Sequence, residues 1–314
     1  IVKSIDVIKK HYLESESVIT IGTFDGVHKG HELVFEHIKN YSELLPAVIT
    51  FKKSPKDVIN NKNVKSIYSI KTKEELISEF GIKNIISIDF DDSIKNLTAE
   101  KFIELLKKYL KLKLLVIGED ATIGKDKIGK KNGLDQILKK YNCNLKSIDI
   151  RKDAQRKISS SELKKLIKLG EIEKVNKNLS KDYFINGKIV EGKKLGRELG
   201  YPTANLEYSK DVIIPKDGIY KTTSIIRGEN FNSITSIGNN PTFNEKIKTI
   251  ETYIIDFNKN IYGEDLKIIF KDFVRNQVKF ENKEDLITQM DKDLKKVSEE
   301  SWKWNLLMSW NGVN

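Results

Sequence analysis

The stretch Gly22-Thr23-Phe24-Asp25-Gly26-Val27-His28-Lys29-Gly30-His31 decides the fold of the first half of the chain. An apolar run, Val18–Ile21, precedes it and is typical of a buried strand, while residues 32–38 carry apolar side chains at helical spacing. Glycines and imidazoles therefore lie where a strand passes into a helix. A helix start offers free N–H groups and a positive dipole end, and glycine lets a phosphate approach the backbone. The pattern predicts a nucleoside triphosphate site, with side-chain donors from His28 and His31.

Two other interpretations of this loop stay open. His28 and His31 are three residues apart and could hold a metal, although no cysteine or third histidine lies near them in the sequence. The loop could also be a solvated turn with incidental histidines. Against that, Asp25-Gly26 and Gly30 are placed around both imidazoles, and this loop holds two of the four histidines in the chain.

Apolar strands and amphipathic helices alternate through the first half of the chain. This alternation predicts an α/β, Rossmann-like domain with a parallel sheet, in which ligands bind at the carboxyl ends of the strands. The glycine-rich loop and Gly118 both fall at such ends. The expected strands after the loop are residues 47–51, 85–88, 114–117 and 145–150, and the expected helices are residues 73–80, 99–110, 134–141, 162–169 and 173–179.

The pattern changes near Ser180, where short strands separated by turn residues begin to dominate. This spacing predicts a small β-barrel, followed by one amphipathic C-terminal helix over residues 283–297. We therefore expect the fold class α/β plus β, with domains at residues 1–180 and 181–314. The tail, residues 301–314, carries all three tryptophans and either packs on the barrel or contacts a partner. The expected barrel strands are residues 184–190, 218–226, 234–237, 250–257 and 266–270.

The chain is strongly basic, with a net charge of +11 over 314 residues. Only five of its 56 basic residues are arginines, which bind phosphates and bases in a bidentate manner better than lysine does. The lysines are also interspersed with acidic residues, so specific nucleic-acid binding is not expected. Acidic small molecules such as nucleotides would still be favoured by the field of the protein. Nothing in the sequence predicts an oligomeric state.

Cysteine content and hydropathy restrict where the protein works. Cys143 is the only cysteine, so an internal disulfide is impossible and a reducing compartment fits. No apolar run approaches the ~20 residues that a membrane-spanning helix needs. We therefore expect a cytoplasmic protein that does not interact with membranes.

Two further stretches carry chemistry. Ser159-Ser160-Ser161 opens an expected helix beside Lys164, where serines cap the helix or hold a phosphate. The run from Gly192 to Asn205 is rich in glycine, so backbone amides can face phosphates. Within it, Thr203 and Asn205 share one strand face and offer oxygen ligands suited to Mg²⁺. A simple β-turn with Pro202 at its corner is the alternative.

These motifs, in this order and at this separation, resemble the bacterial bifunctional riboflavin kinase/FAD synthetase family over nearly the whole chain. The resemblance implies a transferase with an FMN adenylyltransferase module in residues 1–180 and a riboflavin kinase module in residues 181–314. The implied substrates and products are ATP, riboflavin, FMN and FAD, with Mg²⁺ as cofactor. The partners that it implies are the small-molecule substrates riboflavin, FMN and ATP.

In the kinase half, Pro202-Thr203-Ala204-Asn205 matches the magnesium and ATP motif of the family, so Thr203 and Asn205 would hold the metal. Glu251 matches the catalytic base, and Arg275 matches an arginine in the loop on the flavin side. Gln277 stands where the family usually has an acid. The stretch that would cover the ATP phosphates contains Gly187, Lys188, Gly192 and Arg197.

In the adenylyltransferase half, the first loop matches the HxGH nucleotidyltransferase motif, so His28 and His31 would stabilise charge on the phosphates of ATP. The second signature of the family resembles residues 158–164, with Lys164 in place of the usual arginine. The other residues that the resemblance assigns to ATP or flavin are Gly22, Phe24, Asp25, Gly30, Gly118, Asp120, Ser159, Ser160 and Ser161.

Several positions depart from the family pattern in this half. Lys52-Lys53-Ser54-Pro55 stands where the family has an acid and an imidazole, and Ala121 and Ile123 replace aromatic residues. Surface for packing a flavin or adenine ring is thereby reduced. The leading hypothesis is a bifunctional enzyme. The alternatives are a riboflavin kinase with a catalytically weak or structural N-terminal domain, and a nucleotide- or RNA-binding regulator.

Overall fold

The structure is a computed structural model, which describes residues 3–129, 133–149, 159–192, 196, 199–239 and 248–310. Of the residues assigned to a site from the sequence, Arg197 lies outside these ranges. The chain forms two compact units, each described here by itself. The first comprises Ile1–Lys164 and Asn178–Ser180, and the second comprises Lys165–Lys177 and Lys181–Asn314.

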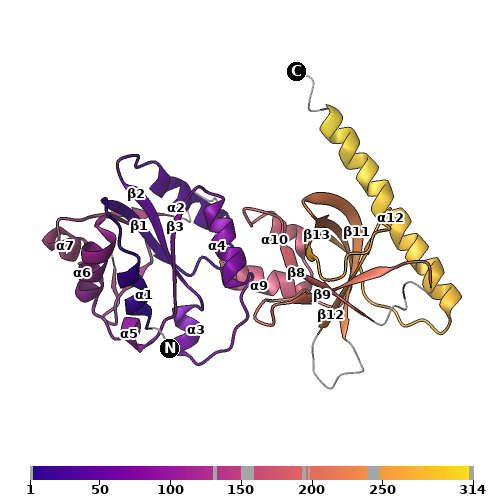
Figure 1. The fold of residues 1–314 in the computed structure, drawn as a ribbon, viewed down its shortest axis with the longest axis horizontal. Coiled ribbons are helices and arrows are strands. Elements are labelled where there is room, and N and C mark those ends of the chain that lie inside the picture. Colours follow the sequence, from indigo (N-terminus) through magenta and orange to yellow (C-terminus); the bar gives the residue numbers. More distant parts are fainter. Residues whose placement is uncertain are drawn as a thin grey trace. The chain divides into compact units, whose positions relative to one another are not determined.

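The first unit is built on a five-stranded parallel sheet with the strand order β3-β2-β1-β4-β7 (Figure 1). All neighbouring strands pair in parallel, so their carboxyl ends meet at one edge. β1 lies in the middle, and the loop that follows it emerges at the centre of this edge. The strands are β1 (Ser17–Gly22), β2 (Leu45–Phe51), β3 (Asn84–Ile88), β4 (Leu112–Gly118) and β7 (Asn144–Ile148).

Helices in the connections between these strands enclose the sheet. α6 has its apolar side chains at helical spacing and buries Phe102, Ile103 and Leu106 in one cluster with sheet residues such as Ile19 and Leu115. The helices of this part are α1 (Ser4–Lys10), α2 (Lys29–Lys39), α3 (Pro55–Ile59), α4 (Ile70–Ser78), α5 (Asp92–Lys95), α6 (Ala99–Leu110) and α7 (Leu134–Lys140), and a small hairpin joins β5 (Thr122–Ile123) to β6 (Ile128–Gly129).

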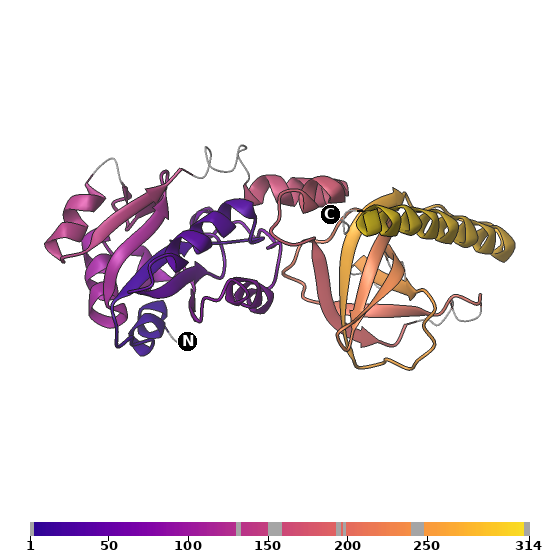
Figure 2. The same ribbon diagram turned by 90° about the horizontal axis from the view of Figure 1, so that it is seen from above.

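The second unit is a closed barrel, seen in Figure 2. Its strand order is β10-β11-β12-β9-β8-β13, and every pairing is antiparallel. Its strands are β8 (Phe184–Val190), β9 (Thr203–Tyr208), β10 (Gly218–Ile226), β11 (Glu229–Asn239), β12 (Lys248–Ile254) and β13 (Asp265–Arg275). Buried and less buried residues alternate along β10, as a strand with one face in a barrel core requires.

Three helices accompany the barrel in sequence. α9 (Ser160–Leu169) and α10 (Ile172–Asn176) precede it, and α12 (Lys283–Trp310) follows it. The first part of α12 lies beside the barrel, and its end projects beyond the barrel in Figure 1. α12 extends well beyond the predicted end at residue 297. α10 ends three residues before the predicted Leu179, so Lys177–Leu179 leave the helix.

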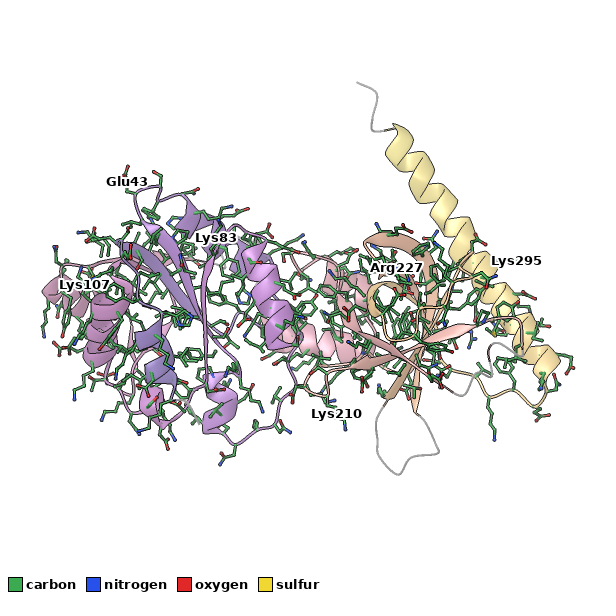
Figure 3. All side chains as sticks on the ribbon, in the orientation of Figure 1. Glu43, Lys83, Lys107, Lys210, Arg227 and Lys295 are labelled. Atoms are coloured by element: carbon green, nitrogen blue, oxygen red, sulfur yellow. The ribbon has the colours of Figure 1, made fainter. Side chains whose placement is uncertain are left out.

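The predicted fold class, a Rossmann-like parallel sheet followed by a small barrel and a C-terminal helix, is confirmed. The surface lysines do not gather on one element. In Figure 3, Lys107 lies on α6 and Lys295 on α12, while Lys83 and Lys210 lie in connections between elements. Among the described residues, no helix is both long enough and apolar enough to span a bilayer.

Candidate active sites

The loop after β1 is tightly wound and mostly buried. Phe24, Gly26 and Val27 all have positive φ angles, of 48°, 87° and 42° respectively. Such angles are uncommon outside glycine, and Phe24 and Val27 reach them inside the protein rather than in solvent. Gly22 is required because a Cβ there would lie only 2.9 Å from the Phe24 ring. The loop is therefore a buried segment whose backbone is fixed by packing, rather than a solvated turn.

His28 and His31 are brought together at the start of α2. His28 is the N-cap residue of the helix, and its ring stacks on that of His31 with centroids 3.5 Å apart. The Nδ1 atoms of both rings are buried without a hydrogen-bond partner. An unpaired buried ring nitrogen is costly, so these atoms are suited to a bound polar ligand.

Both imidazoles are held in the neutral form. Burial lowers the pKa of His28 to about 4, against the opposing effect of Asp25. Burial, then the neighbouring His28 and Lys73, hold the pKa of His31 well below its usual range. Each neutral ring still carries one N–H donor, so the pair can donate hydrogen bonds to phosphate oxygens at neutral pH.

Asp25 joins this loop to the second predicted signature. Its carboxylate forms a buried ion pair with Lys164, with Nζ and Oδ2 2.7 Å apart, and accepts a 2.8 Å hydrogen bond from the Ile67 N–H. Ser160 Oγ donates to the Asp25 carbonyl over 2.8 Å. The structure thus brings together two motifs that lie about 130 residues apart in the sequence, and the Lys164 amine pairs with the Asp25 carboxylate.

Lys73 belongs to the same network and was not predicted from the sequence. Its side chain is buried, and its amine donates to the carbonyls of Thr23 and Phe51 over 2.8 and 2.7 Å. It therefore fastens the chain just after β1 to the end of β2. Burial lowers its pKa to about 8. Lys73 lies on the amphipathic helix α4 among other charged residues, so nothing in the local sequence sets it apart.

The remaining predicted residues of this unit lie around the same edge of the sheet or on the helix that follows. Gly30 is buried in the first turn of α2, and Gly118 ends β4, the strand beside β1. Ser159 Oγ accepts a hydrogen bond from the Glu162 N–H, which is a helix-capping contact and one of the two roles considered for these serines. Asp120 and Ser161 are exposed.

The second unit contains a cavity of about 390 Å³ that brings together three predicted residues, Thr203, Glu251 and Arg275. They come from the different strands β9, β12 and β13. Apolar side chains from α12 and from the segment after β13 also line the cavity, among them Phe280, Leu286 and Met290. A concave, largely apolar site with a few convergent polar groups suits a small molecule with a large ring system.

Arg275 finds its acidic partner on α12. Asp293 accepts from Arg275 Nε over 3.0 Å and from Nη2 over 2.7 Å, and its carboxylate is nearly buried. Gln289 Nε2 donates to the same carboxylate over 2.9 Å. Gln277 instead donates to Ser236 Oγ over 3.2 Å. The arginine is therefore paired even though position 277 lacks an acid.

The other predicted residues of the barrel lie on β8 and β9 or beside them. Asn205 lies opposite Glu251 in the β9–β12 ladder, and a Cβ on Gly192 would come 2.1 Å from its amide nitrogen. Gly187 and Lys188, on β8, are not among the residues lining the cavity, and Pro202 is exposed just before Thr203. A Cβ on Gly187 would lie 1.9 Å from the Glu207 carbonyl, so this glycine permits close strand approach.

Comparison with known proteins covers both units. A family model described as FAD synthetase matches residues 10–162, and one described as riboflavin kinase matches residues 179–300. A protein of Listeria monocytogenes named bifunctional riboflavin kinase/FMN adenylyltransferase is 33% identical, over 90% of this chain and 91% of its own length. A Bacillus subtilis protein of the same name is 32% identical, over 93% and 96% of the two chains.

The chain belongs to the bifunctional riboflavin kinase/FMN adenylyltransferase family. A crystal structure from Streptococcus pneumoniae, described as a macrolide-efflux protein, shares the fold over 93% of this chain and 96% of its own, with a TM-score of 0.82 and 29% identity. The family models and the named relatives cover both units, so the resemblance noted from the motifs is confirmed.

Two of the residues that depart from the family pattern, Lys52 and Ile123, can be placed in the first unit: one is at the surface and the other is in the core. Lys52 pairs with Asp89 at the surface, with Nζ and Oδ2 2.8 Å apart. Ile123, which replaces an aromatic residue, is buried in the core cluster of the first unit. Among the described residues, no group of three or more histidine, cysteine or acidic side chains is placed to hold a metal, so His28 and His31 lack a third ligand of these kinds.

Proposed function

We propose that this protein makes FMN from riboflavin and MgATP in its second unit, and FAD from FMN and ATP in its first. The observation that carries the proposal is that each unit has a site of its own that suits its reaction. These are the cavity with Thr203, Glu251 and Arg275, and the buried histidine loop. The single cysteine and the use of ATP support a cytoplasmic location.

In the kinase reaction, Glu251 acts as general base. Its carboxylate takes the proton of the ribityl 5′-hydroxyl while that oxygen forms a bond to the γ-phosphorus of ATP and the bond to the β-γ bridging oxygen breaks, which releases ADP. The place of Glu251 in the cavity wall supports this role. The apolar side chains of the same wall suit the flavin ring, and Arg275 lies among them.

Mg²⁺ fits the oxygen donors of Thr203 and Asn205, which are hard ligands on one face of β9. Two protein ligands are few, as is usual for Mg²⁺ carried by the phosphates of a nucleotide. When bound, the ion would neutralise charge on the ATP phosphates. The Gly192 backbone, which Asn205 approaches closely, leaves no room for a side chain between them.

In the adenylylation reaction, an oxygen of the FMN phosphate forms a bond to the α-phosphorus of ATP, and the bond to pyrophosphate breaks. The neutral rings of His28 and His31 donate N–H hydrogen bonds to the oxygens on which negative charge develops. The N-terminus of α2 adds its dipole to the same region. The loop conformation is stabilised by the ion pair between Asp25 and Lys164 and by the hydrogen bond from Ser160 to the Asp25 carbonyl.

A riboflavin kinase with a weak adenylyltransferase is the second candidate, because of specific substitutions in the first unit. Lys52 and Ser54 stand where the family has an acid and an imidazole. Ile123, which stands where the family has an aromatic residue, is buried in the core cluster and so presents no ring for stacking. Incubation with riboflavin and MgATP, followed by chromatography of the flavins, separates the candidates. Successive appearance of FMN and FAD supports the bifunctional enzyme, FMN alone supports the kinase, and neither product contradicts both.

A further inference from the structure

The histidine loop is fastened by three residues that lie outside the part of the chain matched by the FAD synthetase model. That model ends at residue 162, whereas the segment Asn178–Ser180 packs with the first unit. Leu179 and Ser180 instead fall within the riboflavin kinase match, which begins at residue 179. We refer to Asn178–Ser180 as the strap.

The strap pairs with the loop residue by residue. The Ser180 Oγ donates to the Val27 carbonyl over 2.6 Å, and the Ser180 N–H donates to the same oxygen over 3.2 Å. Leu179 forms a β-bridge with His28, and the Lys29 N–H donates to the Asn178 carbonyl over 3.0 Å. The contacts therefore span the residue before His28, His28 itself and the first residue of α2.

These contacts hold a backbone conformation that Val27 would otherwise avoid. Val27 is β-branched and fully buried, yet its φ is 42°, in the left-handed region. A β-branched residue persists there only where the surroundings over-determine it. Two hydrogen bonds from Ser180 converge on the carbonyl of this residue, directly before His28. The strap therefore holds the backbone directly before and at His28.

We infer that Asn178–Ser180 is a positioning segment of the adenylylation site, which fixes Val27 and so aims His28 at the nucleotide phosphates. The inference rests on the proposed adenylyl transfer to FMN. It predicts that a residue matched to the kinase family controls the other reaction. Ser180 does not touch the reacting atoms in this account and acts through Val27 and His28.

The test is the Ser180→Ala variant of the full chain, with Ser17→Ala as the matched control. Ser17 is also a buried serine of the first unit, whose Oγ donates to the Leu110 carbonyl, but it lies at the opposite end of β1. We expect Ser180→Ala to lower kcat for FAD formation from supplied FMN by about 10- to 100-fold, as a misplaced catalytic group does. Riboflavin phosphorylation should stay within twofold.

Ser180→Thr keeps the hydroxyl and should restore most of the lost FAD formation, whereas Ser17→Ala should lower thermal stability without this loss of kcat. Hydrogen exchange gives a second readout that needs no activity. Amides of residues 24–31 should exchange faster in Ser180→Ala and not in Ser17→Ala. If Ser180→Ala does not fold, Ser180→Cys, which offers a weak donor of similar size, is compared with Ser17→Cys.

A strap variant with unchanged FAD formation and unchanged exchange at residues 24–31 would overturn the inference. So would equal losses of kcat in the Ser180 and Ser17 variants, because that outcome indicates a general loss of stability. If the wild-type protein makes no FAD, the proposed function fails instead, and exchange at the loop still decides whether the strap holds it.

Discussion

The ion pair between Arg275 and Asp293 allows the sharpest prediction about the barrel site, through the Asp293→Asn variant. The carboxylate of Asp293 accepts hydrogen bonds from Nε and Nη2 of the guanidinium and from Gln289, and its side chain is only 7% exposed. Asparagine keeps the shape but turns an NH₂ group towards a cation. Removing one partner of a buried pair costs about 3–5 kcal/mol.

The expected loss of free energy is smaller here, because the Arg275 side chain is 21% exposed and water can solvate the guanidinium once the carboxylate is removed. We therefore expect Asp293→Asn to cost about 2 kcal/mol. Arg275 and Asp293 both line the cavity, so a site that is loosened by this amount must be reordered when riboflavin binds. Since 1.4 kcal/mol corresponds to a factor of ten, the KM for riboflavin should rise roughly 10- to 30-fold.

The assay is steady-state phosphorylation of riboflavin at saturating MgATP, with FAD formation from supplied FMN as an internal reference. Glu284→Gln is the matched control, because it removes an acidic charge from the exposed first turn of the same helix. It should leave the KM for riboflavin unchanged. An Asp293→Asn enzyme whose KM for riboflavin stays within twofold of the wild-type value would refute the reasoning.

Three further predictions follow from the two sites. Glu251→Gln should lower kcat for FMN formation by about 10²–10⁴-fold and leave FMN adenylylation intact, and a loss below tenfold would argue against a general base. Replacing His28 and His31 with alanine should have the opposite selectivity, lowering FAD formation by about 10²–10³-fold; equal losses in both reactions would contradict separate sites. The pKa of Lys73 is about 8 in the folded protein and near 10.5 when unfolded, so its burial costs stability at low pH and not at high pH. The unfolding free energy of wild type relative to Lys73→Met should therefore rise by about 3 kcal/mol from pH 8 to 10.5, measured by denaturant titration, and a constant difference would disprove the assignment.

The fold could be anticipated because local patterns carry it. Val18–Ile21 and residues 114–117 are apolar runs of strand length, and both are central strands of the observed sheet. The helical stripe over residues 99–110 coincides with α6. The change to short strands after Ser180 likewise marks the barrel. Each of these signals depends on neighbouring residues, which a single sequence displays directly.

The contacts that build the sites could not be anticipated in the same way, since they join residues far apart in sequence. Asp293 pairs with Arg275 from α12, where it is one of several acidic residues and nothing in the local sequence marks it. In the sequence, Lys73 resembles any lysine of an amphipathic helix. Its role depends on contacts with the Thr23 and Phe51 carbonyls, which lie far from it in the sequence. Leu179 continues the helical pattern of residues 173–179, yet it pairs with His28 because Asn176 ends the helix.

Labelled phosphate followed from ATP into the flavins distinguishes two transfer reactions on one chain from either reaction alone. Riboflavin is incubated with the protein and with ATP labelled at either the γ- or the α-phosphate, and FMN and FAD are separated. We expect γ-label to enter FMN and then FAD, and α-label to enter FAD alone. Label from the α-position in FMN, or no label in either flavin, would contradict this expectation.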